Sequence, residues 1–323
     1  MKVVSQTGRE DIALIFIAEI SGGRKVECVE SLQPPLPREK KWVLIVSTLF
    51  GCPVRCRFCD AGGFYEGALS RDEIFEQIDY LIDRRYPERK VPAEKFKIQF
   101  ARMGEPSLND NVLAVLEELP RRYEAPGLII SLSTIAPVGR ENFFRELLMV
   151  KRRLPPGRFQ FQVSLHTTDQ ALWDWLVPTP KWDYARIAEY GKAFFQNGDR
   201  KIVLNFALAE GMPVDPVRLL KYFHPDLFFI KITPLNPTYT ARLNRISSHI
   251  IPEKQDYEII ESLKKAGYEV LLSVGEWEEN KIGSNCGQYL LKHLTEKENL
   301  TAGYTYPTKN LNSDSNVPDN LMF

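Results

Sequence analysis

Apolar segments of strand length alternate with amphipathic segments of helix length along most of this chain. Strands are expected at 42–46, 96–101, 128–133, 159–165, 201–208, 227–232 and 268–274. Between them, helical periodicity follows the capping pattern at Ser70 and recurs at about 110–119, 141–153, 183–197, 215–222 and 253–266. Repeated units of this kind give a parallel sheet with helices on its outer side. About six of them predict an α/β fold, a partial (β/α)6 barrel with functional loops at the carboxyl ends of its strands.

A short cysteine-rich loop follows the first of these strands. Cys52, Cys56 and Cys59 have the spacing Cys-x3-Cys-x2-Cys, with Phe58 just before the last thiol. Three thiolates can hold three irons of a [4Fe–4S] cluster and leave the fourth iron open to a ligand. This spacing is typical of radical S-adenosylmethionine (SAM) enzymes, in which the open iron binds SAM. The alternative is a zinc knuckle, but the ten residues after Cys59 contain neither His nor Cys as a fourth ligand.

The two ends of the chain differ from this repeating core. Residues 1–41 are expected to form a β-hairpin extension, with strands at 12–20 and 25–30, followed by a Pro-rich connector. The core then covers 42–297. Residues 298–323, rich in Asn, Thr, Pro and Ser, are expected to be a disordered tail.

Composition bears on where the protein is located and on which partners it binds. Five cysteines, with three in one motif, favour a reducing cytoplasm over a disulfide framework. The N-terminus lacks the pattern of a signal peptide, and no apolar run approaches the ~20 residues that a membrane span needs. The formal net charge of zero weakens the case for a nucleic-acid partner, because contacts with phosphates supply much of such affinity.

Polar residues recur where successive strands are predicted to end. Each of them taken alone is more often a turn or core residue, whereas their shared position at one edge of the sheet favours a binding site. Glycine at such a position lets a ligand approach the backbone, and a carboxylate can hold an ammonium group. The strand-end candidates are Gly104, Glu105, Ser133, Ser164, Leu165, His166 and Asn236. A further candidate is the lone cysteine Cys286, although most lone cysteines are small buried hydrophobes.

The motifs together resemble those of the radical SAM ribosomal RNA adenine methyltransferases of the RlmN/Cfr type. Cys-x3-Cys-x-Phe-Cys, Met-Gly-Glu-Pro-x-Leu-Asn, Ser-Thr, Ser-Leu-His, Val-Pro, Pro-x-Asn-Pro and Cys-Gly-Gln occur here in the family's order, over about residues 25–294. The resemblance implies a radical SAM barrel with a [4Fe–4S] cluster on Cys52, Cys56 and Cys59. It also implies contacts between SAM and the strand-end residues Gly104, Glu105, Ser133, Ser164, Leu165, His166 and Asn236, together with Phe58.

The resemblance also implies catalytic roles for two residues outside the cluster loop. Cys286 would receive a methyl group from one SAM molecule. A second SAM, cleaved to a 5′-deoxyadenosyl radical, would then turn that group into a methylene radical that adds to an unreactive sp² carbon. Glu27 would be the general base that removes a proton from the adduct. A low-potential electron donor, such as flavodoxin or ferredoxin, would reduce the cluster.

Three features depart from the family pattern. Ile45 occupies the position of the family's second cysteine, which releases the adduct, and Cys28 is a poor substitute because neighbouring strand residues point to opposite faces. Acidic residues at Glu276–Glu279 replace arginines and disfavour RNA as the substrate. The family's N-terminal accessory domain is expected to be missing, because the chain begins near the predicted hairpin.

Three functions are therefore weighed. The first is radical methyl transfer through Cys286, which the retention of this cysteine and Glu27 supports. The second is 5′-deoxyadenosyl-radical chemistry on a small molecule or peptide without methyl transfer, motivated by Ile45. The third is an iron–sulfur redox sensor without enzymatic activity. The mass of the Cys286 peptide would separate the first two.

Overall fold

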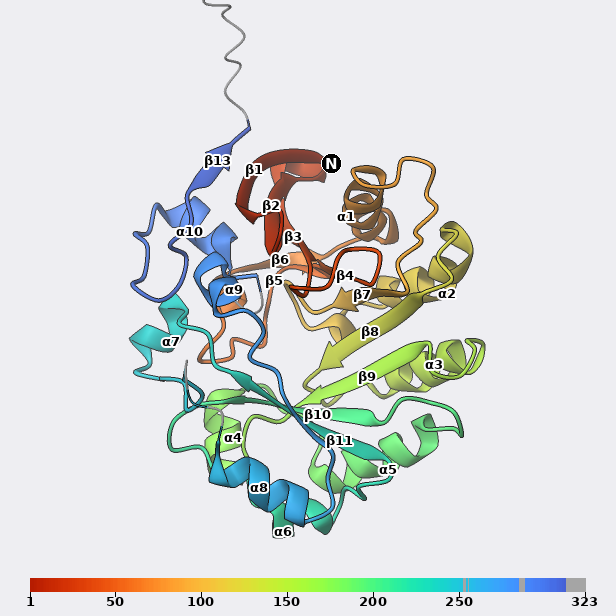
Figure 1. The fold of residues 1–323 in the computed structure, drawn as a ribbon, viewed down its shortest axis with the longest axis vertical. Coiled ribbons are helices and arrows are strands. Elements are labelled where there is room, and N and C mark those ends of the chain that lie inside the picture. Colours follow the sequence, from red (N-terminus) through yellow and green to blue (C-terminus); the bar gives the residue numbers. More distant parts are fainter. Residues whose placement is uncertain (252–253, 255, 285–287, 312–323) are drawn as a thin grey trace, which may run out of the picture.

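A single eleven-stranded sheet forms the centre of the protein (Figure 1). The computed structural model describes residues 1–251, 254, 256–284 and 288–311. The strand order is β12-β11-β10-β9-β8-β7-β4-β3-β2-β1-β13, parallel from β12 to β4 and antiparallel from β4 to β13. The strands of this sheet are β1 (Lys2–Arg9), β2 (Ala13–Glu19), β3 (Lys25–Ser31), β4 (Lys41–Val46), β7 (Lys95–Phe100), β8 (Leu128–Thr134), β9 (Phe159–Ser164), β10 (Ile202–Leu208), β11 (Phe228–Pro234), β12 (Val270–Leu272) and β13 (Thr308–Asn310).

The predicted alternation of strands and helices is confirmed. The helices are α1 (Arg71–Asp83), α2 (Asn111–Arg122), α3 (Glu141–Arg152), α4 (Gln170–Leu176), α5 (Tyr184–Phe194), α6 (Pro216–Leu220), α7 (Tyr239–Leu243), α8 (Glu258–Lys265), α9 (Trp277–Ile282) and α10 (Tyr289–Thr295). The sequence did not predict α4, α7, α9 and α10, which have five to seven residues and are too short to show a helical period. A separate two-stranded sheet, β5 (Leu49–Gly51) and β6 (Tyr65–Ala68), frames the cysteine loop.

The main apolar core lies between the outer face of the sheet and the helices. Strand β7 shows why, since Phe96, Ile98 and Phe100 are fully buried in this core while Lys97 and Gln99 alternate with them on the opposite face. On this strand the face that points into the partial barrel is therefore polar. This alternation places polar side chains on the side where a ligand can bind.

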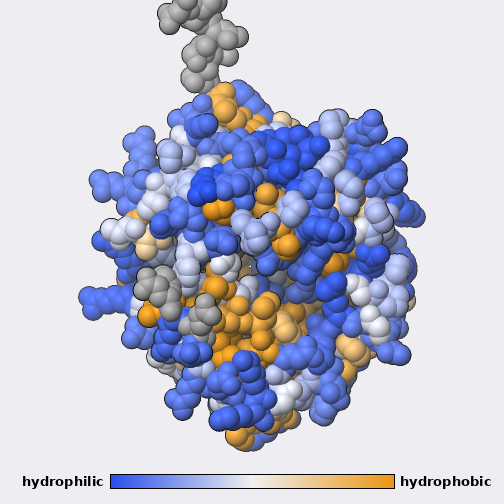
Figure 2. All heavy atoms as spheres, viewed as in Figure 1, coloured by the Kyte–Doolittle hydropathy of each residue, from blue (hydrophilic) through white to orange (hydrophobic). Residues whose placement is uncertain are grey.

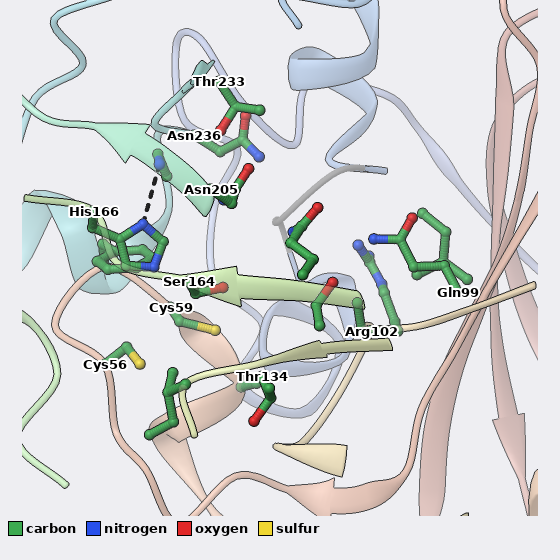
Figure 3. A pocket seen from close by; sticks show the side chains of 18 of the residues that line it. Cys56, Cys59, Gln99, Arg102, Thr134, Ser164, His166, Asn205, Thr233 and Asn236 are labelled. Atoms are coloured by element: carbon green, nitrogen blue, oxygen red, sulfur yellow. Dashed lines mark hydrogen bonds between the residues drawn. The ribbon is translucent and has the colours of Figure 1, made fainter. Parts of the chain in front are cut away.

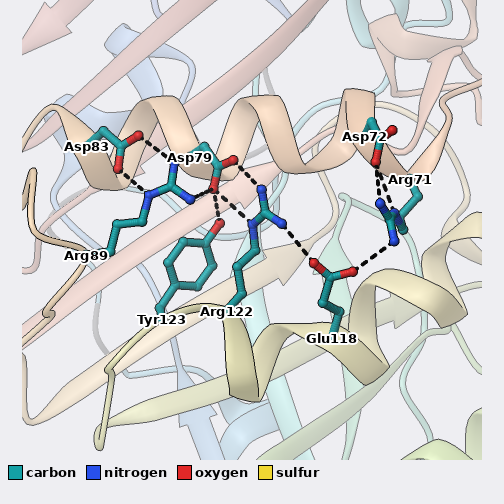
Figure 4. Close-up of polar contacts among 8 residues, drawn as sticks. All are labelled: Arg71, Asp72, Asp79, Asp83, Arg89, Glu118, Arg122 and Tyr123. Atoms are coloured by element: carbon teal, nitrogen blue, oxygen red, sulfur yellow. Dashed lines mark hydrogen bonds and ion pairs between the residues drawn. The ribbon is translucent and has the colours of Figure 1, made fainter.

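A network of charged side chains joins α1 to α2 on the outside (Figure 4). Arg122 donates to Asp79 at 2.6 Å and to Glu118 at 2.8 Å, and Glu118 also pairs with Arg71 at 3.1 Å. Helix α1 begins with the predicted capping box, in which the Ser70 side chain accepts from a backbone N–H of the first turn. These contacts fix the first two helices of the barrel against each other.

The two ends of the chain extend the same sheet. The predicted hairpin is confirmed as β2 and β3, and β3 pairs with β4, so the N-terminal strands continue the core sheet. The prediction of disorder from residue 298 is wrong for 298–311, because β13 pairs with β1 and Tyr304 is 1% exposed. Tyr304 stacks on Tyr239 with ring centroids 5.0 Å apart, and this aromatic burial outweighs the polar composition of the segment. Residues 312–323 lie outside the described residues.

Hydrophilic residues cover most of the face seen in Figure 2, apart from an apolar area near its centre. Among the described residues, no helix has the length and apolarity needed to span a bilayer.

Candidate active site

A cavity of about 270 Å³ opens at the carboxyl ends of the parallel strands (Figure 3). It collects residues from the cysteine loop and from the ends of β7 to β11, as expected for a barrel site. Ten of the residues that the sequence predicts for the site line it, namely Cys52, Cys56, Phe58, Cys59, Gly104, Glu105, Ser133, Ser164, His166 and Asn236. The sequence did not predict other lining residues, among them Gln99, Arg102, Gln162, Asn205, Lys231 and Glu279.

Hydrogen bonds from distant segments hold the backbone of the cysteine loop. The Thr238 hydroxyl donates to the Phe58 carbonyl at 2.7 Å, and the Asn244 amide donates to the Arg57 carbonyl at 2.9 Å. These donors flank α7, a helix that the sequence did not predict. The backbone of the loop is therefore held by hydrogen bonds that do not involve its thiols.

The three thiols of the cysteine loop line one cavity. Burial raises the pKa of Cys52 to about 11, and burial followed by the charges of Cys59 and Cys52 raises the pKa of Cys56. Among the described residues, no group of three or more His, Cys, Asp or Glu side chains can hold a single metal ion. A [4Fe–4S] cluster binds each thiolate to a different iron, and three thiols in one loop are the donor set that such a cluster takes.

Asp60, the residue after the third thiol, is a fully buried hydrogen-bond acceptor. Its carboxylate accepts from the Thr240 backbone and hydroxyl at 2.8 and 2.7 Å, from the Tyr239 backbone at 3.2 Å and from the Tyr304 hydroxyl at 2.5 Å. The Tyr304 hydroxyl in turn accepts from the backbone N–H of Gln288 at 2.9 Å. Asp60 thus ties the cysteine loop to α7 and to the C-terminal segment.

Replacing Asp60 with asparagine is expected to destabilise the protein and to reduce its iron content. The amide has one acceptor oxygen instead of two, so buried donors around it lose their partner, at about 1–3 kcal/mol. Urea unfolding and iron analysis after reconstitution measure the two effects. Asp72→Asn, at an exposed position in the first turn of α1, is the matched control. Equal stability and iron content in the two variants would refute this role of Asp60.

Gly104 and Glu105 shape the turn after β7. Gly104 has φ +97°, and a Cβ there would lie 2.5 Å from the Cβ of Leu49, so only glycine fits. The buried carboxylate of Glu105 accepts from the Thr134 hydroxyl at 2.5 Å and from the Ile135 backbone at 2.9 Å. Burial raises the pKa of Glu105, whereas these hydrogen bonds lower it. Glu105 therefore braces the next strand end as well as lining the cavity.

Three buried oxygens that line the cavity have no hydrogen-bond partner among the described residues. They are Ser133 Oγ near the end of β8, Asn205 Oδ1 in the middle of β10 and Asn236 Oδ1 two residues after β11. Buried acceptors without a partner are costly, which indicates a ligand that donates to them. The ammonium and hydroxyl groups of SAM are such donors, so the residues present fit this cofactor.

His166 is a neutral group beside the cysteine loop. It has φ +68°, and its Nδ1 accepts from the backbone N–H of Ala207 at 3.1 Å. Burial lowers the pKa of His166 to about 4, so at neutral pH the ring proton is on Nε2. The ring packs edge-on against Phe58, with centroids 4.9 Å apart. In Figure 3, His166 and Cys56 lie across the cavity from Gln99 and Arg102.

Glu27, the predicted base, is fully buried and does not line the cavity. Arg102, which does line it, donates to the Glu27 carboxylate at 2.5 Å and to the carbonyls of Gly283 and Ser284 at 3.0 and 3.1 Å. The Leu290 backbone also donates to Glu27. Burial raises the pKa of Glu27, and Arg102 opposes this shift. These contacts occupy the Glu27 carboxylate, and its role as a base stays a prediction.

The remaining predicted residues divide between the core and the undescribed part of the chain. Leu165 is fully buried in the main core, and its backbone N–H donates to the Asn205 carbonyl at 3.0 Å. Ile45, on β4, lines the cavity. Cys28, on β3, points to the other face of the sheet and is buried in the main core. Cys28 therefore cannot take the place of the missing cysteine. Cys286 lies outside the described residues.

The acidic segment around α9 is less exposed than its sequence indicates. Glu279 is 8% exposed and accepts from the Ser31 hydroxyl at 2.8 Å. Glu278 accepts from the Tyr306 hydroxyl at 2.5 Å and pairs with Lys281 at 3.1 Å. Repulsion of a phosphate backbone at this loop therefore depends mainly on Glu276.

The fold is that of a radical SAM barrel. A radical SAM methyltransferase from Sphaerobacter thermophilus has a similar crystal structure, with a TM-score of 0.62 and 20% identity over 88% of this chain and 81% of that one. The partial barrel predicted from the sequence is thereby confirmed. No protein-family model matches the chain.

The chain also resembles curated proteins named probable dual-specificity RNA methyltransferase RlmN, as its motifs predicted. One from Synechococcus is 30% identical over 216 residues, 65% of this chain and 60% of that protein. One from Chlorobium phaeobacteroides is 29% identical over 289 residues, 87% of this chain and 74% of that protein. The chain thus spans about 60% of the length of the Synechococcus relative.

Proposed function

We propose that this protein is a radical SAM enzyme of the methyltransferase type, which transfers a methyl group to an unreactive sp² carbon. The observation that carries the proposal is one cavity that holds three cluster-spaced thiols and three unpartnered buried oxygens. The resemblance adds Cys286 as the methyl carrier and a low-potential flavodoxin or ferredoxin as the reductant. RNA is the substrate named for the curated relatives.

The residues of the chain divide the work in this proposal. Cys52, Cys56 and Cys59 would hold the [4Fe–4S] cluster, which with bound SAM supplies a 5′-deoxyadenosyl radical. Ser133, Asn205 and Asn236 accept hydrogen bonds and so orient the bound molecule. The apolar side chains of Ile45, Val54, Phe58 and Ile135 line the same cavity and exclude water from it.

The experiment is anaerobic reconstitution of the cluster, reduction with dithionite and incubation with SAM. We expect the electron paramagnetic resonance spectrum of the reduced cluster to change on addition of SAM, and 5′-deoxyadenosine to form. We also expect the Cys286 peptide to gain the mass of one methyl group. If SAM does not change the spectrum of the reduced cluster and no 5′-deoxyadenosine forms, the proposal is refuted. That result would support an iron–sulfur sensor instead.

One observation favours a second candidate function. Ile45 lines the cavity at the position of the family's second cysteine and has no nucleophile, so release of a covalent adduct lacks its agent. Radical chemistry without methyl transfer needs no such release. In this case the same assay would yield 5′-deoxyadenosine while the Cys286 peptide keeps its unmodified mass.

A further inference from the structure

One short segment after β11 lines the cavity and also holds the cysteine loop. Asn236 is 5% exposed and lines the cavity with an Oδ1 that has no partner among the described residues. Two residues later, the Thr238 hydroxyl donates to the carbonyl of Phe58, in the cysteine loop, at 2.7 Å. In Figure 3, Asn236 and Cys59 lie on the same side of the cavity, across from Gln99. A group bound at Asn236 is therefore connected to the cysteine loop through a single short segment.

The turn between Asn236 and Thr238 is rigid. The Thr238 backbone N–H donates to the Asn236 carbonyl at 2.9 Å, which closes a three-residue turn with Pro237 at its centre. The proline ring fixes φ of Pro237 close to the value that such a turn needs. The Thr238 hydroxyl also accepts from the Ala241 backbone N–H at 3.0 Å, so two partners fix its orientation. A displacement at Asn236 is therefore transmitted to Thr238.

The hydrogen bond from Thr238 acts on the peptide unit that joins Phe58 to the third thiol residue. The Phe58 carbonyl and the Cys59 N–H belong to this one planar unit. Thr238 holds its carbonyl, whereas its N–H donates to the Cys56 carbonyl at 3.1 Å. Because the Cα of Cys59 lies in the same plane, the orientation of this unit helps to set where the thiols of the loop lie relative to Asn236.

We propose that Thr238 is a positioning residue that sets the spacing between the cluster and the part of SAM that Asn236 binds. SAM would contact the open iron and Asn236 together, so both contacts form only when the two are correctly spaced. Thr238 is not among the residues that line the cavity, and it acts through the Phe58 carbonyl and the three-residue turn. This role rests on the proposed function, because it requires both the cluster and SAM.

A second threonine holds the same loop from another direction. The hydroxyl of Thr179, between α4 and α5, donates to the Val54 carbonyl at 3.2 Å. Thr179→Val therefore removes a hydrogen bond to the cysteine loop, as Thr238→Val does, but leaves the turn at Asn236 unchanged. The comparison separates a specific effect on spacing from a general loosening of the loop.

The experiment measures SAM binding by cluster-reconstituted variants. Isothermal titration calorimetry uses the oxidised cluster, which has no electron for the cleavage of SAM. We expect Thr238→Val to retain its iron and to bind SAM about tenfold more weakly, as for the loss of one hydrogen bond. Thr238→Ser, which keeps the hydroxyl, and Thr179→Val should bind SAM as the wild type does. The electron paramagnetic resonance spectrum of the reduced cluster, frozen with SAM, should change only in Thr238→Val.

A double variant tests whether Thr238 acts through the contact at Asn236. Asn236→Ala removes the acceptor and should itself weaken SAM binding about tenfold. Adding Thr238→Val should then weaken binding little further, because the contact that Thr238 positions is already lost. Two independent losses would multiply to about 100-fold, and that result would overturn the inference.

Other outcomes also decide the matter. If Thr238→Val does not fold or does not bind iron, Pro237→Ala takes its place, because it keeps the hydroxyl and only loosens the turn. It should bind SAM about threefold more weakly, and unchanged binding would overturn the inference. Equal losses in Thr179→Val and Thr238→Val would also overturn it. Unchanged SAM binding by Thr238→Val would overturn this inference alone, whereas a wild-type cluster that does not respond to SAM would refute the proposed function as well.

Discussion

Replacing Arg102 with methionine is expected to lower the free energy of unfolding by about 3–5 kcal/mol. Arg102 and Glu27 form an ion pair whose side chains are both 0% exposed. Methionine has a similar length but leaves the Glu27 carboxylate and the carbonyls of Gly283 and Ser284 without their donor. The unfolding transition in urea, followed by circular dichroism, measures the loss.

Two comparisons identify the cause of that loss. The double variant Glu27→Leu with Arg102→Met removes both charges and should recover part of the stability, because replacing a buried pair with apolar residues is less costly than breaking it. Arg153→Met removes a cation from a pair with Glu117 in which both side chains are exposed, and should cost at most about 1 kcal/mol. If Arg102→Met costs no more than Arg153→Met, the buried pair does not stabilise the fold.

Replacing Cys56 with serine is expected to reduce the iron content of the reconstituted protein strongly and 5′-deoxyadenosine formation at least about 100-fold. Iron–sulfur clusters are held by thiolates, and a serine hydroxyl, which loses its proton far less readily than a thiol, is a weaker ligand for iron. Iron analysis, the visible absorption spectrum and chromatography of the nucleoside measure these effects.

Cys28→Ala is the matched control for the loss of a thiol. Cys28 is fully buried in the main core, on the opposite face of β3 from the cavity side. It should keep the iron content and the nucleoside yield of the wild type, with only a modest loss of stability. If Cys56→Ser retained full iron, the cluster would be bound elsewhere and the proposed site would be wrong.

Local pattern was enough to predict the parallel part of the sheet and most of the lining of the cavity. Strands β7 to β11 have alternating or continuous apolar runs, and parallel strands bring their carboxyl ends to one edge. Once that edge is known, Glu105, Ser133, His166 and Asn236 are neighbours by topology alone. The three candidate cluster ligands, Cys52, Cys56 and Cys59, were predicted from their spacing alone.

Contacts between distant segments could not be predicted in this way. Arg102 pairs with a carboxylate 75 positions earlier, and Tyr304 meets Asp60 from 244 positions away. Nothing in the local sequence of Tyr304 marks it as buried, because its neighbours are polar and the stacking partner Tyr239 belongs to a short, unpredicted helix.

The side chains that pack the main core and the polar side chains that line the cavity lie on opposite faces of the sheet. The main apolar core lies between the outer face of the sheet and the helices, so exchanging the polar residues Gln99, Gln162 or Lys231 on the inner face removes little apolar packing. Stability and specificity can then change almost independently. In protein engineering, a large share of variants with substitutions on the inner face of the barrel should therefore still fold. In evolution, the same barrel can acquire new substrates without first acquiring extra stability.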